Sequence, residues 1–274
     1  MNKKSIIIAV ILAIVGIVGF NYYQKIFSKS VVKNGAIFIK SDDDIYEVKR
    51  ALTPFIKNID DFSFVAEKKN YNKPKGGKYI LKEGMSNNTV VNLLRSGNQT
   101  PVKVSFNNQD TLEKLAGRIA TQIEPDSISL LTVMKDATFL AENKFTKASA
   151  LGMYLPNSYE FFWNTTAEQF RFRMLKEYKR FWNDTRLKKA KDIGLAPNEV
   201  IALASIVHEE SKQAAEQPKI AGVYMNRIRI GMPLQADPTL KFAAYQLPQY
   251  KNLTYEDYKA DLAESFEGIG SISF

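Results

Sequence analysis

One apolar run near the N-terminus constrains this chain more than any other feature. IIIAVILAIVGIVGF, Ile6 to Phe20, contains no charged residue. As a helix at about 1.5 Å per residue it would be about 22 Å long, short of the roughly 30 Å hydrocarbon core of a bilayer. Ser5 before it and Asn21-Tyr22-Tyr23 after it lengthen the run, and tyrosine is frequent at membrane interfaces. Such a stretch is either a membrane anchor or a signal peptide.

The sequence favours an uncleaved anchor. The nearest small-x-small cleavage site is Ser28-Lys29-Ser30, which lies far downstream of Phe20. Lysines flank the run on both sides, so the positive-inside rule orients it only weakly. We expect a single-pass protein of the cytoplasmic membrane, with a very short cytoplasmic tail and the rest of the chain outside the cytoplasm.

Composition excludes several kinds of site. The 274 residues are 45% hydrophobic and 24% charged, as in globular proteins, and include no cysteine, which rules out disulfides and thiolate chemistry. The single histidine, His208, disfavours both a Ser-His-Asp triad and a multi-histidine metal site. We therefore expect neither a metal nor a cofactor. The net charge of +9 fits a membrane surface or an acidic polymer, and nucleic acid is disfavoured because no recognised binding motif accompanies the charge.

Three segments behind the anchor share one order: a short apolar strand, a polar turn and an amphipathic helix. They are GAIFIKSDDDIYEVKRAL, GGKYILKEGMSNNTVVNLLRSG and PVKVSFNNQDTLEKLAGRIA. Ser41 or a following aspartate can cap the first helix and Ser86 the second, which Gly97 can close. These units are shorter than βαβ crossovers, so the sequence predicts an α+β fold. The expected inward positions of the three helices are Ile45, Val48 and Leu52; Val90, Leu93 and Leu94; and Leu112, Leu115 and Ile119.

From about residue 160 the pattern becomes mainly helical. Phe170, Met174, Tyr178 and Phe181 recur at helical spacing, which predicts a buried stripe rather than a ligand platform. The aromatic cluster of Tyr159 to Trp163 leaves two interpretations open, because such rings either fill a core or stack on sugar faces.

Two adjacent glutamates end the apolar run in LASIVHEESK. Pro197 suits the first turn of this helix, with Glu199 near the positive end of its dipole. On a helical wheel with Leu203 at 0°, the apolar face is centred near about 10°; Glu210 falls at about 340° and Glu209 at about 240°. The wheel thus directs Glu210 toward apolar neighbours, where desolvation favours the neutral carboxyl group that a general acid requires. The alternative is that the helix ends here and Glu210 reaches water.

A second helix and a polar loop follow. Pro218 suits the start of this helix, Gly231 can close it, and Ile220, Val223, Tyr224 and Ile228 form its expected buried stripe. LQADPT then places amide, carboxylate and hydroxyl groups in a turn fixed by Pro238. We expect this loop to form the wall of a cleft.

The segment LASIVHEES…EQPKIAGVYMNRIRIGMPLQADPT resembles the MltG (YceG-like) family of endolytic lytic transglycosylases. LGMYLPNSYEFFWNTTAEQF is similar to a second family segment, and YILKEGMSNNTVVNLLRSG to its LysM-like module. The resemblance implies a membrane anchor with its tail in residues 1–23, a linker in 24–34, a small LysM-like α/β module in 35–102 and a mainly helical catalytic domain in 103–274.

The implied activity is cleavage of peptidoglycan strands at MurNAc-GlcNAc bonds without water. One glutamate acts as acid and then as base, and the C6 hydroxyl of MurNAc closes onto C1 to give a 1,6-anhydro end. The family's glutamate falls on Glu210, and Asn226, Gln235, Asp237 and Thr239 match polar family positions assigned to substrate binding or to orienting the acid. His208 falls on a variable position and receives no role. Implied partners are glycan strands, the membrane and cell-wall synthesis proteins.

The sequence departs from the family after about Leu240. It ends at Phe274 without the family's Y-N-T-Y…G-L-P-P-G-P-I segment, which we expect to leave Glu210 more exposed and to weaken activity. This departure favours the alternative of a non-catalytic peptidoglycan-binding or scaffold protein. A hydrolytic muramidase is a third interpretation; it needs a second carboxylate, for which Asp237 and Glu216 are the nearby candidates.

Overall fold

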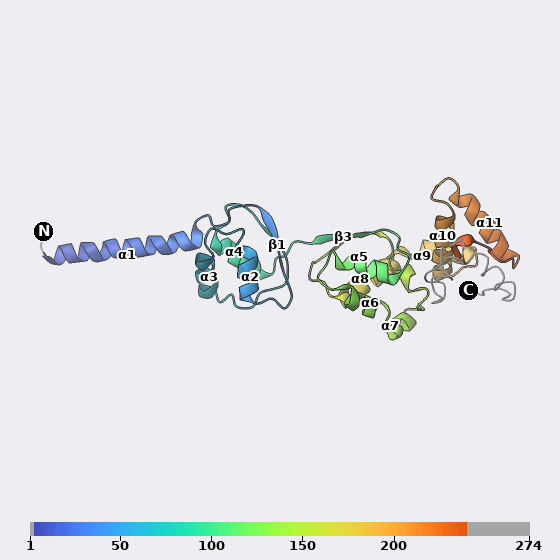
Figure 1. Ribbon diagram of the computed structural model, residues 1–274, viewed down its shortest axis with the longest axis horizontal. Coiled ribbons are helices and arrows are strands. Elements are labelled where there is room, and N and C mark those ends of the chain that lie inside the picture. Colours follow the sequence, from blue (N-terminus) through green and yellow to red (C-terminus); the bar gives the residue numbers. More distant parts are fainter. Residues whose placement is uncertain (1–2, 240–274) are drawn as a thin grey trace, which may run out of the picture. The chain divides into compact units, whose positions relative to one another are not determined.

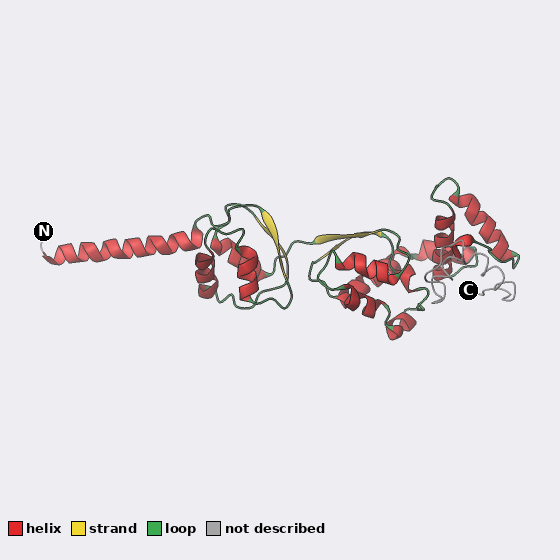
Figure 2. Cartoon of the chain, in the orientation of Figure 1, coloured by secondary structure: helices red, strands yellow, loops and turns green. Residues whose placement is uncertain are grey.

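The computed structural model describes residues 3–239 and combines many helices with short strands (Figure 2). The predictions that concern residues 240–274, including the missing family segment, lie outside the described residues. Two compact units divide the chain: one comprises residues up to Asp136 and Pro156–Arg173, the other Ala137–Leu155 and the residues from Met174 onward. A mainly helical chain with antiparallel strands agrees with the expected α+β class.

The first helix, α1, spans Lys3–Phe27 (Figure 1). Its stretch Ile6–Phe27 has a mean hydropathy of 2.4 and none of it is buried. At about 1.5 Å per residue this stretch is about 33 Å long, which matches the hydrocarbon core of a bilayer. The helix therefore continues past the predicted apolar run and is long and apolar enough to cross a membrane.

A two-stranded sheet and three helices follow α1. Strands β1 (Gly35–Ile39) and β2 (Gly77–Leu81) pair antiparallel, with Gly35 opposite Leu81. The helices are α2 (Ile45–Leu52), α3 (Ile59–Lys68) and α4 (Asn87–Ser96). The fully buried side chains of the sheet and the helices form one core, which includes Val48, Leu52, Phe62, Tyr79, Val90 and Leu94.

The predicted caps of this unit are confirmed. The Asp44 carboxylate accepts hydrogen bonds from the backbone N–H groups of Tyr46 and Glu47 at the start of α2. Ser86 accepts one from the Thr89 N–H at the start of α4, and Gly97 follows α4 with φ 73°. Helix α3, capped by Asn58, was not predicted, although Phe62, Val65 and Ala66 stand at helical spacing and Asn58 with the following aspartates is a helix-start signal.

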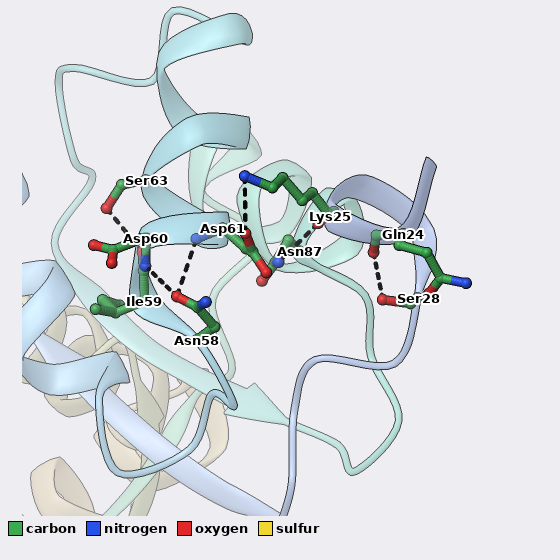
Figure 3. A network of polar contacts seen from close by, with 9 residues as sticks. All are labelled: Gln24, Lys25, Ser28, Asn58, Ile59, Asp60, Asp61, Ser63 and Asn87. Carbon is green, nitrogen blue, oxygen red and sulfur yellow. Dashed lines mark hydrogen bonds and ion pairs between the residues drawn. The ribbon is translucent and has the colours of Figure 1, made fainter. Parts of the chain in front are cut away.

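The end of α1 is held against α3 and α4 (Figure 3). The Asn87 side-chain amide donates to the Lys25 carbonyl at 2.9 Å, and the Lys25 ammonium lies 3.6 Å from the Asp61 carboxylate. Val31, four residues beyond the helix, is only 2% exposed and belongs to the core. Residues 24–34, predicted as a linker, thus contain a helix end and a core residue.

A second antiparallel pair consists of β3 (Val102–Phe106) and β4 (Asn157–Phe161), with Val104 opposite Tyr159. Helices α5 (Leu112–Ala120) and α6 (Ser127–Met134) pack against each other beside β3. The inward positions predicted for α5 are confirmed. Strand β4 was not predicted; its partner lies about fifty residues earlier, so no local turn signal marks it.

The other unit is helical. It contains α7 (Ala137–Glu142), the short 3₁₀ helix η1 (Ala150–Met153) and the second part of α8 (Ala167–Phe181), followed by α9 (Asp184–Asp192), α10 (Pro197–Glu210) and α11 (Gln217–Arg229). The predicted stripe of α8 is confirmed at Phe170 and Met174, which are fully buried. At its end the prediction is wrong: Phe181 is 39% exposed, and the next residue, Trp182, is buried instead. The helix ends at Phe181, so the helical period no longer decides which side chain turns inward.

Candidate active site

The glutamate helix, α10, spans Pro197–Glu210 and begins as its sequence predicts. Pro197 occupies the first turn, and the Glu199 carboxylate accepts a hydrogen bond of 2.6 Å from the Ala196 N–H. That bond satisfies a donor that the helix itself cannot pair, and it places a negative charge at the positive end of the dipole. The start of α10 is therefore fixed.

One face of α10 is apolar and packs against α11 (Gln217–Arg229), which lies beside it in Figure 1. Ile206 and Val207 are buried, with 7% and 6% exposed, and share a cluster with Tyr224 and Ala236. Leu203 is partly buried in the same cluster. The apolar face predicted from the helical wheel is thus confirmed.

Glu210 is the last residue of α10, and it is exposed. Of the two interpretations of the sequence, its exposure agrees with the one in which the helix ends here and the carboxyl group reaches water. One side of it nevertheless has a fixed neighbour: the Tyr224 hydroxyl donates to Glu210 Oε1 at 2.8 Å. Glu210 combines access to solvent with one defined hydrogen bond from α11.

The neighbouring carboxylate has a different environment. Glu209 is exposed, and its Oε1 lies 2.7 Å from the ammonium nitrogen of Lys212, three residues later. A short-range ion pair of this kind is typical of a solvated helix end and contributes little to stability. The two adjacent glutamates thus differ in their partners, and only Glu210 is linked to a buried group.

Tyr224 is that buried group, with 7% of its surface exposed. Burial, the hydrogen bond to Glu210 and the charge of Glu210 raise the pKa of Tyr224 to about 12. This value also includes smaller opposing effects of the Arg227 guanidinium, which lowers the pKa, and of the Asp237 carboxylate, which raises it. The sequence correctly predicted that Tyr224 is buried but gave it no polar role. Because a buried tyrosine hydroxyl usually has a hydrogen-bond partner, its place in the buried stripe could have indicated one.

The rest of the predicted stripe of α11 is only partly buried. Ile220 packs against the cluster, but Val223 is 51% exposed and Ile228 is 39% exposed. The prediction is wrong for these two residues because, among the described residues, the face of α11 that meets α10 is narrow. Gly231 follows the helix with φ 67°, and its N–H bonds to the Ile228 carbonyl, as predicted.

The polar loop after α11 is attached to that helix. The Arg227 guanidinium donates to the Leu234 carbonyl, and Ala236 is buried in the cluster. The Thr239 hydroxyl donates to the Ala236 carbonyl at 2.6 Å. Gln235 has φ 48°, in the left-handed region that residues other than glycine rarely adopt. The loop is therefore turned sharply at Gln235 and anchored on both sides.

The residues predicted to bind substrate lie on α11 and on this loop, and they differ in their hydrogen bonds and in their proximity to Tyr224. Asp237 is exposed and close enough to Tyr224 to affect its ionisation. The Asn226 side-chain oxygen accepts a hydrogen bond from Arg229, and Thr239 bonds within its own turn. Glu216, a candidate second carboxylate, accepts a hydrogen bond of 2.6 Å from the Ser211 hydroxyl. The structure thus places Asp237 near the Tyr224–Glu210 pair, whereas the hydrogen bonds found for Asn226 and Thr239 lead elsewhere.

Outside this region, the aromatic cluster of Tyr159 to Trp163 begins within β4 and is only partly buried. Tyr159 and Phe161 are buried, whereas Phe162 is 50% exposed. Trp163 contacts Phe38 edge to face at 5.2 Å, and both rings line a hollow of about 410 Å³. Within residues 3–239, no group of three or more histidine, aspartate and glutamate side chains is arranged to hold a metal ion.

Comparison with known proteins identifies the family. The YceG-like family model matches residues 37–265. Over 221 residues the chain is 24% identical to the endolytic murein transglycosylase of Bacillus subtilis strain 168, covering 75% of this chain and 61% of that protein. Over 231 residues it is 27% identical to the endolytic murein transglycosylase of Streptococcus pneumoniae serotype 2, covering 73% of this chain and 41% of that protein.

Among solved structures, the chain is similar to a putative YceG-like protein of Listeria monocytogenes, with a TM-score of 0.48 and 24% identity, covering 77% of this chain and 75% of that one. The chain spans about three fifths or less of the length of these curated relatives. The family model alone matches well over half of the residues, so the chain belongs to the YceG-like family.

Proposed function

We propose that this chain is an endolytic lytic transglycosylase of peptidoglycan in which Glu210 is the catalytic acid and base. The observation that carries the proposal is the hydrogen bond of the exposed Glu210 to buried Tyr224, beside a polar loop. A carboxyl group that is open to a large substrate, yet held on one side, suits proton exchange with a glycan. The names of the curated relatives support the same substrate.

The proposed reaction needs one carboxyl group. Glu210 gives its proton to the glycosidic oxygen while the bond from this oxygen to C1 of MurNAc breaks. The resulting carboxylate then takes the proton of the C6 hydroxyl, whose oxygen bonds to C1. No water is consumed, so the second carboxylate of ordinary glycosidases is not required.

Further residues complete the proposal. We assign contacts with the sugar to Asp237 and Gln235, both exposed on the loop, with Asn226 and Thr239 as additional polar groups of the same region. We assign residues 35–102 to a LysM-like module and 103–274 to the catalytic domain. Helix α1 anchors the chain in the cytoplasmic membrane, so that both parts act on the wall outside the cytoplasm. Other proteins of cell-wall synthesis are the expected partners.

A second candidate is a non-catalytic peptidoglycan-binding or scaffold protein. The observation that favours it is the exposure of Glu210, because a carboxyl group open to water lacks the dry surroundings that strengthen acid catalysis. Both candidates bind glycan strands, so they differ only in turnover.

Mass spectrometry of the products from purified peptidoglycan separates the candidates. The full-length chain in detergent is compared with Glu210→Gln and with the matched neighbour Glu209→Gln. We expect anhydro-ended fragments from the native chain and from Glu209→Gln, and none from Glu210→Gln. Hydrated reducing ends would replace the transglycosylase by a hydrolase. If the native chain binds glycan but releases no fragments, the scaffold candidate replaces it.

A further inference from the structure

We propose that Tyr224 is a positioning residue for Glu210: its hydroxyl holds one carboxyl oxygen, so that the other oxygen exchanges the proton with the glycan. The inference rests on the proposed role of Glu210 and adds a second residue, from a different helix, to the site. It is carried by the position of the Tyr224 ring and by the direction of its hydrogen bond.

The Tyr224 ring is fixed by packing. It is 7% exposed and lies in the cluster formed with Ile206, Val207 and Ala236. Because close-packed side chains stay in single rotamers, the hydroxyl at the end of this ring has a defined place. Glu210, in contrast, is an exposed side chain at a helix end and would otherwise sample several rotamers. The 2.8 Å hydrogen bond from Tyr224 Oη to Glu210 Oε1 therefore favours the Glu210 rotamers that keep this contact.

Tyr224 acts as a donor throughout the working pH range. Its pKa of about 12 keeps the phenol protonated, so it neither supplies the proton of the reaction nor competes for it. The charged groups that face it are Glu210 and Asp237, which disfavour the phenolate, and Arg227, which favours it. The net effect is a stable hydroxyl donor.

The hydrogen bond distinguishes the two oxygens of Glu210. Oε1 uses a lone pair to accept from Tyr224, so the transferable proton lies on Oε2. In the first step this proton moves from Oε2 to the glycosidic oxygen, and in the second the proton of the C6 hydroxyl returns to Oε2. The bond from Tyr224 to Oε1 is kept in both steps, and a hydrogen bond to an ionised acceptor is stronger than one to a neutral acceptor.

Tyr224→Phe removes the hydroxyl and leaves the ring in place. The matched control is Tyr178→Phe, because the Tyr178 hydroxyl makes a similar half-buried bond of 2.9 Å, but to the amide oxygen of Asn198 and not to a carboxylate. We expect Tyr224→Phe to lower kcat about 10-fold with KM changed less than about 2-fold, since the bond acts on the reacting group and not on sugar binding. Tyr178→Phe should leave both constants unchanged. Equal kcat values for the native chain and Tyr224→Phe would overturn the proposal.

A spectroscopic test does not depend on turnover. In the full-length chain labelled at tyrosine Cζ, the Tyr224 resonance is assigned by its loss in Tyr224→Phe. In Glu210→Gln the carboxylate charge is gone, so the ionisation of Tyr224 should begin at lower pH than in the native chain, and Glu209→Gln should have no effect. An unchanged Tyr224 titration in Glu210→Gln would refute the coupling.

The two tests separate failure of the inference from failure of the proposed function. If the native chain releases no anhydro products while Tyr224 still responds to Glu210→Gln, the proposed function fails and Tyr224 keeps only its contact. If products form but neither kcat nor the resonance responds, the role of Tyr224 is wrong and the transglycosylase stands.

Discussion

Val31 tests whether the segment after helix α1 is part of the fold. Val31 and Val32 are adjacent and chemically identical, but Val31 is 2% exposed and Val32 is 43% exposed. The Val31 N–H donates to the Met85 carbonyl at 2.9 Å, and its carbonyl accepts from the Gly84 N–H at 2.9 Å. A flexible linker would make the two valines equivalent, whereas the structure makes them different.

The expected magnitude follows from burial. Val31→Ala removes two buried methyl groups at about 0.8 kcal/mol each, and the cavity left behind raises the loss to about 2 kcal/mol. For a unit of this size, 1 kcal/mol corresponds to about 2–4 °C in Tm, so we expect a fall of about 4–8 °C. Val32→Ala changes the same atoms in a half-exposed place and should shift Tm by about 1 °C or less.

Thermal unfolding of the full-length chain in detergent, followed by circular dichroism, measures both variants. Replacing either valine changes β-propensity equally, so the difference between the two reports burial alone. Equal Tm values for Val31→Ala and Val32→Ala would refute the reasoning and return residues 24–34 to a linker. With the expected difference, helix α1 ends at a fixed place on the folded unit, where the Lys25 carbonyl accepts from Asn87 and the Lys25 ammonium pairs with Asp61.

Two further predictions concern stability. The Tyr71 hydroxyl is buried without a hydrogen-bond partner among the described residues, so Tyr71→Phe should stabilise the chain by about 1 kcal/mol, measured by thermal unfolding. A destabilised variant would contradict this. Burial raises the pKa of Tyr71 above its unfolded value near 10, so native stability should fall as the pH rises above about 10, and less so in Tyr71→Phe; an equal fall in both proteins would contradict the pH prediction. Trp182→Ala should lower the free energy of unfolding by about 3–5 kcal/mol. Phe181→Ala should lower it clearly less, because the Phe181 ring is partly exposed and lies under the Arg186 guanidinium. Equal losses for the two variants in urea unfolding would show that the two positions were assigned wrongly.

The local parts of the fold could be predicted from the sequence, and the non-local parts could not. Asp44, Ser86 and Gly97 bond to groups within three residues of themselves, so their roles can be read from neighbouring sequence. Strand β4 depends on pairing with a strand about fifty residues away, and the choice between Phe181 and Trp182 depends on packing beyond the end of a helix. Neither pairing nor packing leaves a periodic signal.

In the candidate site, too, local features could be predicted from the sequence and non-local ones could not. The helical wheel identified the face of α10 that carries Glu210, because that face depends only on the period of one helix. The exposure of Glu210 and its bond to Tyr224 depend on where α10 ends and how α11 returns against it, which no single-helix pattern contains.

The connection between these helices therefore helps to set the position of the Glu210 carboxyl group. Six residues join α10 to α11, and their ends are tied together: the Ser211 hydroxyl donates to Glu216 at 2.6 Å, and the Gln217 amide donates to the Ser211 carbonyl at 3.1 Å. These bonds fix the distance between the last residue of α10 and the first residue of α11. That distance in turn sets how close Tyr224 on α11 lies to Glu210 at the end of α10. Since a hydrogen bond weakens steeply with small displacements, a loosened connection would free the Glu210 carboxyl group even with every atom of Glu210 and Tyr224 unchanged. The placement of the Glu210 carboxyl group is thus a property of the helix pair, and Glu210 alone does not define the candidate site.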